Sequence, residues 1–170
     1  MPDSGVDYGD LPAWFALVVS LVTAFNQLRV NSKSEKTRQA DEQRSKRERE
    51  TDQQKLRIEQ MMKDVEDLSA LSVDYWMRSG SDTGTAGVLI NSKIRDLSSR
   101  VYRYNNFLWS SAGQDFLLLK QAITGGTFQS VTRVAARETS ATIRAVTSAS
   151  SSFKDKLREE FDKLDMRSNY

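Results

Sequence analysis

The strongest constraint on this chain is an uncharged, apolar run over residues 11–28. A helix over this run is about 27 Å long at about 1.5 Å per residue, close to the thickness of the bilayer hydrocarbon core. Pro12 suits the first helical turn, where a backbone N–H has no partner, and Trp14 suits a membrane interface. The run therefore predicts a single transmembrane helix, preceded by a short acidic tail over residues 1–10.

Two other interpretations of the run remain open. It is compatible with a cleaved signal peptide, because Val22, Thr23 and Ala24 resemble a small-residue cleavage site, although the preceding tail is acidic whereas such signals begin with basic residues. It is also compatible with a buried helix of a soluble protein, since the run is short for a membrane span.

The basic residues indicate an orientation. Lys and Arg within about 15–20 residues of a span stay on the cytoplasmic side, and here all of them follow the run. We therefore expect an inner (plasma) membrane protein of a bacterium, with its N-terminus outside and residues 29–170 in the cytoplasm. The basic cluster expected to contact anionic lipid consists of Arg29, Lys33, Lys36 and Arg38.

Three small residues recur every four positions within the run, namely Ala16, Ser20 and Ala24. Small side chains on one face let two membrane helices approach closely, so this face predicts packing between copies. The alternative is that alanine and serine occur there without any such role.

A charged stretch over residues 29–55 follows the run. Opposite charges and polar residues at spacings of three and four favour an exposed helical stalk, and a disordered linker is the alternative. No aromatic residue lies between Phe25 and Tyr75, so the stretch offers no platform for base stacking. We therefore expect the basic residues to set topology and meet lipid rather than bind nucleic acid.

Helical periodicity begins at Leu56, so a helical bundle is expected over residues 56–170. One set of apolar residues recurs at spacings of four, three, four, three and four: Ile90, Ile94, Leu97, Val101, Tyr104 and Leu108. Such a heptad pattern is typical of a helix that packs along one face. The partner is either another helix of the same bundle or a second copy in a coiled coil.

Two further helices complete the expected bundle. A short one carries the apolar run 116–119 after a cap at Ser110 and Ser111, and a long one extends over residues 128–165 with a weak point at 148–152. In the long helix Val131 and Val134 are expected to be buried, and Glu138 to pair with Arg100 or Arg103. The predicted fold is all-α: a single-pass transmembrane helix, a charged helical stalk and a three- or four-helix bundle.

The composition excludes several chemistries. The chain has no cysteine and no histidine, which removes thiolate nucleophiles, thiolate metal sites and the Ser-His-Asp triad. The glycines over 80–87 lack the lysine and the preceding strand of a phosphate-binding loop. We therefore predict a non-enzymatic protein with no catalytic residue, metal, cofactor or small-molecule substrate, although an enzyme based on carboxylates alone is a third possibility.

Two functions fit this architecture. The first is a membrane protein whose cytoplasmic bundle binds a protein partner or assembles with itself. The second is an effector that perturbs the bilayer, such as a small toxin or an anti-phage defence component, for which a short, slightly polar span is suitable.

Overall fold

A computed structural model describes residues 11–168, with the side chains of 11–14, 18, 26, 28–34, 36, 37, 167 and 168 left out of the description. The described residues form helices and loops without any strand, which confirms the all-α prediction. The elements in chain order are α1 (Leu11–Met77), the 3₁₀ helix η2 (Gly80–Asp82), α2 (Ala86–Arg103), α3 (Ala112–Thr124) and α4 (Ala141–Ser168).

The chain divides into two units between Arg49 and Glu50, and α1 contributes residues to both. In the first unit, large apolar side chains of α1 are exposed: Phe15, Leu17, Val19, Leu21, Val22 and Phe25. The hydroxyl of Thr23 donates a hydrogen bond to the carbonyl of Val19 at 2.7 Å, so this polar group is satisfied within the helix.

Among the residues that the structure describes, no helix is both long enough and apolar enough to cross a membrane. The transmembrane helix predicted over 11–28 includes seven residues whose side chains lie outside the description, Trp14 and Leu28 among them. The predicted acidic tail, residues 1–10, lies entirely outside the described residues.

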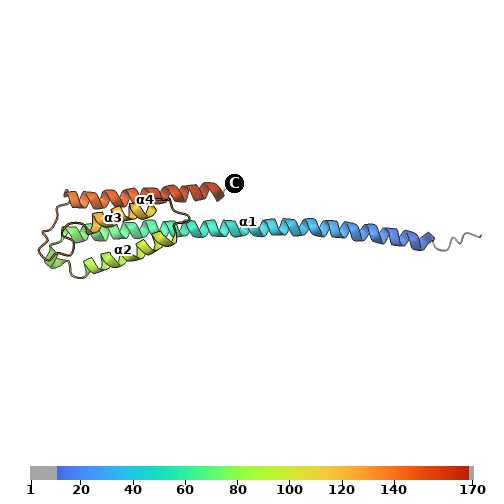
Figure 1. Cartoon of the computed structure of the whole chain (residues 1–170), viewed down its shortest axis with the longest axis horizontal. Helices are drawn as coiled ribbons and strands as arrows, with labels where there is room; N and C mark the ends of the chain where they lie inside the picture. The colour runs from blue at the N-terminus through green and yellow to red at the C-terminus, as the bar shows by residue number, and fades with distance from the viewer. Residues whose placement is uncertain (1–10, 169–170) are drawn as a thin grey trace, which may run out of the picture. The chain divides into compact units, whose positions relative to one another are not determined.

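The second unit is a bundle of four helices, made of the C-terminal part of α1 together with α2, α3 and α4. Figure 1 shows α2 and α4 along opposite edges of the bundle, with α1 and α3 between them. The apolar faces of all four helices meet in one core, whose most completely buried side chains include Ile58, Met61, Val65, Leu68, Tyr75, Ile90, Leu97, Leu119, Ile123, Val146, Phe153 and Leu157.

Ion pairs join neighbouring helices around this core. Arg100 of α2 pairs with Asp64 of α1, and Lys156 of α4 pairs with Asp115 of α3 at 2.8 Å. Lys154 of α4 contacts Glu66 of α1 at 3.0 Å, although this pair is more exposed. Exposed pairs contribute little stability, so the packed core holds the bundle together more than the exposed pairs do.

The segment 125–140, which we name the strap, corrects the sequence analysis. The last helix was predicted to begin at residue 128, but α4 begins at Ala141. The strap is not helical because its backbone bonds to η2 and to the end of α1 instead: Gly80 N–H donates to the Arg133 carbonyl at 2.8 Å, and Ala136 N–H donates to the Trp76 carbonyl at 2.8 Å.

One buried side chain of the strap and one glycine of η2 explain why the strap packs closely. The Arg133 guanidinium is buried with its carbon 3.9 Å from the centre of the Tyr75 ring, and it donates to the Arg78 carbonyl at 3.0 Å. A Cβ at Gly80 would meet the carbonyl oxygens of Ser130 and Val131. Glycine is therefore needed where the strap crosses η2.

This course of the strap changes the predicted exposure of its residues. Val131 and Val134 were expected to be buried, but they are exposed because no helix turns them toward the core. Glu138 is also exposed and does not pair with Arg100, which binds Asp64 and Asp96 instead. The weak point expected at 148–152 does not interrupt α4.

Candidate interaction surface

Of the six heptad residues, Ile90, Ile94, Leu97 and Val101 lie on α2, whereas Tyr104 and Leu108 follow its last residue, Arg103. Ile90, Ile94, Leu97, Val101 and Leu108 are buried in the core, and Tyr104 is half-buried. The Tyr104 ring packs on Phe107, with 5.1 Å between ring centres, and on the guanidinium of Arg57. This face is therefore occupied by the chain's own helices and is not a free surface for a coiled coil.

The other predicted site residues lie in the first unit. Ala16, Ser20 and Ala24 are exposed along one face of α1, as their spacing of four requires. Thr23 and Gln27 lie on the same side, so this face carries small and polar groups while the large apolar side chains cover the rest. Of the basic cluster, Arg38 is exposed, whereas the side chains of Arg29, Lys33 and Lys36 lie outside the description.

A surface that the sequence analysis missed lies between α2 and α3. Tyr102 of α2 is 82% exposed and Leu117 of α3 is 49% exposed, although buried core residues lie within one helical turn of each. On α2 the outward face follows helical spacing through Val88, Asn91, Arg95, Ser98 and Tyr102. On α3 it follows Gly113, Leu117 and Lys120. We name these eight residues the α2–α3 surface.

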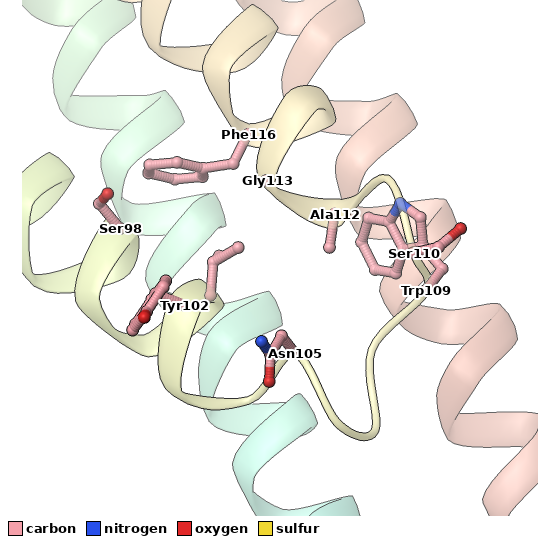
Figure 2. Close-up of a pocket in the computed structure, with 9 residues that line it drawn as sticks. Ser98, Tyr102, Asn105, Trp109, Ser110, Ala112, Gly113 and Phe116 are labelled. Carbon is pink, nitrogen blue, oxygen red and sulfur yellow. The ribbon is translucent and has the colours of Figure 1, made fainter.

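The α2–α3 surface is hollowed in two places. One cavity of about 270 Å³ lies between the C-terminal end of α2 and the start of α3, and its lining includes Tyr102, Asn105, Trp109 and Phe116. Figure 2 shows side chains around this cavity from three sources, α2, the connecting turn and α3.

A second, more open cavity of about 620 Å³ continues along the two helices and is lined by Arg95, Ser99 and Lys120 among others. Ser98 and Tyr102 line both cavities, so the two are adjacent, and we name them together the groove.

The acidic residues of α2 and α3 do not neutralise the positive charge of this groove. Asp96 of α2 is turned toward Arg100 and binds it. Asp115 of α3 accepts hydrogen bonds from Trp109, Ser111 and Lys156. Within the described residues, no acidic side chain pairs with Arg95 or Lys120. The groove therefore combines positive charge, hydroxyl groups and an exposed aromatic ring.

The bonds at Asp115 fix one end of the groove. Burial alone would raise the pKa of Asp115, but the hydrogen bonds from Lys156, Trp109 and Ser111 and the charge of Lys156 outweigh it and lower that pKa. The carboxylate therefore stays ionised and holds the turn before α3 against α4. Ser111 is the residue before α3, as predicted, but its hydroxyl binds Asp115 instead of capping a backbone N–H.

A signal for this surface is present in the sequence. The run from Phe116 to Leu119 is apolar throughout. The helix buries only Phe116 and Leu119 and exposes Leu117 and Leu118. Because a helix that packs along one face cannot bury four consecutive apolar residues, such a run on a short helix indicates exposed apolar surface.

Comparison with known proteins gives no further information. No protein-family model matches the chain, and neither a curated protein nor a solved structure shows significant similarity to it.

Proposed function

We propose that this chain is a non-enzymatic membrane protein whose helical bundle binds protein through the α2–α3 surface. The observation that carries the proposal is the groove itself, which is lined by exposed Tyr102 and by Arg95 and Lys120, two cations that form no ion pair within the described residues. Exposed Leu117 lies on the same face of α3 as Lys120. Exposed aromatic residues and arginine are enriched where proteins bind one another. A long, open groove suits a helix or an extended peptide better than a small molecule, which is usually enclosed.

We further propose that residues 11–28 anchor the bundle in a membrane, with residues 29–170 in the cytoplasm. Support comes from the absence of charge in this run and from the six large apolar side chains that the first unit leaves uncovered. Burying such side chains in hydrocarbon is favourable by about 25 cal/mol per Å² of apolar surface. The basic residues that follow the run support the orientation, together with contact to anionic lipid.

One observation favours the effector as a second candidate. Ser20, Thr23 and Gln27 are polar and exposed on one side of α1, beside Ala16 and Ala24. Copies that associate along this side would gather polar groups within a membrane, which suits an assembly that perturbs the bilayer. Controlled expression distinguishes the two functions: the effector predicts dye entry and growth arrest, and the binding protein predicts neither.

The binding function is tested by a photo-crosslinking benzophenone amino acid placed at Tyr102 of the full chain in the host cell. We expect an irradiation-dependent protein adduct from position 102. The control is the same amino acid at Lys63, which is exposed on α1 away from the groove. If position 102 yields no protein adduct, or no more than position 63, the groove is not a protein-binding surface.

A further inference from the structure

The outer face of α4 carries a stripe of exposed acidic side chains. Asp155, Glu159 and Asp162 are all exposed, and their spacings of four and three align them on one face of the helix. Within the described part of the chain, no lysine or arginine forms an ion pair with any of the three. Met166, one turn further along the same face, is 59% exposed.

This acidic stripe is complementary to the α2–α3 surface. The groove is lined by Arg95, Lys120 and the exposed ring of Tyr102, with Leu117 exposed beside it on α3, while α4 carries three carboxylates and the exposed apolar side chain of Met166.

We propose that the acidic stripe of α4 in one copy docks in the α2–α3 surface of a second copy, so that the bundle is its own partner. The proposal rests on the protein-binding role of the groove given above. Within one copy the stripe cannot reach the groove, because α4 and α2 lie along opposite edges of the bundle (Figure 1).

The geometry of this contact has a consequence for assembly. The two surfaces are different, so the contact is heterologous and leaves one groove and one stripe open at the ends of each pair. Repetition of the contact generates rings or linear arrays of chains. Opposite charges guide the approach of the copies, and raising the salt concentration weakens it because it screens those charges.

Charge reversal tests the proposal in the full chain. The groove variant carries Arg95→Glu and Lys120→Glu, and the stripe variant carries Asp155→Lys, Glu159→Lys and Asp162→Lys. We expect sedimentation in detergent to show salt-sensitive oligomers for the wild type and at least a tenfold weaker association for each variant alone. An equimolar mixture of the two variants should associate again, because each groove then meets a stripe of opposite charge.

A matched control reverses two exposed cations away from the groove, Lys63→Glu and Arg137→Glu, with the same change in net charge as the groove variant. We expect it to associate like the wild type. Circular dichroism of every variant confirms that the helices are intact. If both variants associate like the wild type, or if the mixture fails to associate, the proposal is wrong.

Crosslinking from position 102 separates this proposal from the binding function on which it rests. We expect an adduct between two copies of the chain, joined to a peptide from α4. An adduct with a different protein would overturn self-docking and leave the binding function standing. An adduct with lipid alone, or none at all, would overturn both.

Discussion

Two stretches of the same helix, α1, differ in how far their large apolar side chains are exposed. Between residues 15 and 25 the large apolar side chains are exposed, with Phe15 74% and Phe25 71% accessible. Between residues 58 and 75 they are buried, with Ile58 and Val65 at 0%. The later stretch belongs to the bundle, where α2, α3 and α4 supply a second apolar surface. Exposed apolar surface of this kind marks places where a protein meets a partner or a membrane.

The largest expected effect compares two phenylalanines from these stretches. Phe153 is 1% exposed and packs edge-on against Phe116 and Trp109, so Phe153→Ala should lower the free energy of unfolding of the bundle by about 3–5 kcal/mol. Phe25→Ala should change it by less than about 0.5 kcal/mol. Chemical denaturation followed by circular dichroism measures both. Equal losses would mean that the first stretch is also covered within the chain.

A smaller effect is expected from adding bulk rather than removing it. Gly80→Ala places a methyl group against the Val131 carbonyl oxygen, at a separation of 2.6 Å before any shift, and should lower the free energy of unfolding by about 1–3 kcal/mol.

In the first stretch Ala24→Leu should leave the unfolding of the bundle unchanged, since Ala24 is exposed. The same change should weaken association between membrane-embedded copies.

Gly113→Ala is the matched control for the bundle. A Cβ at Gly113 meets nothing within 4 Å, and alanine favours helix over glycine, so a gain of up to about 1 kcal/mol is expected. If Gly113→Ala lowers the free energy of unfolding as much as Gly80→Ala does, contact with the strap does not explain the effect of Gly80→Ala.

The smallest effect concerns a polar contact of the bundle. Asp115→Asn removes the ion pair with Lys156 and should lower the free energy of unfolding by about 1–2 kcal/mol. Because folding lowers the pKa of Asp115, its stabilisation is present above the ordinary value of about 4 and is lost as pH falls through the lowered pKa.

Denaturation of the wild type and of Asp115→Asn between about pH 7 and pH 2 measures this effect, and the difference between the two should shrink at the acidic end. Glu138→Gln, at an exposed carboxylate, is the control and should leave the free energy of unfolding unchanged at pH 7. A difference that persists undiminished at low pH would contradict the role assigned to the ionised carboxylate.

Helical periodicity was enough to predict the bundle and much of its core. The spacing from Ile90 to Val101 marks a buried face because a helix repeats on this period, whereas Leu108 is buried in the turn after α2 has ended at Arg103. The strap was not predictable in this way, because its conformation depends on bonds to Gly80 and Trp76, which are distant in sequence. The groove was missed for a similar reason, since Tyr102 and Leu117 become one surface only when α2 packs against α3.

The most direct measurement is amide hydrogen exchange of the full chain, synthesised with and without lipid vesicles that contain anionic lipid. We expect the amides of residues 15–25 to exchange much more slowly with vesicles than without them. The exchange rates of amides in the bundle core, such as those of Leu97 and Leu157, should not change. If residues 15–25 are equally protected without lipid, or exchange at the same rate with it, the cover proposed for this stretch is wrong.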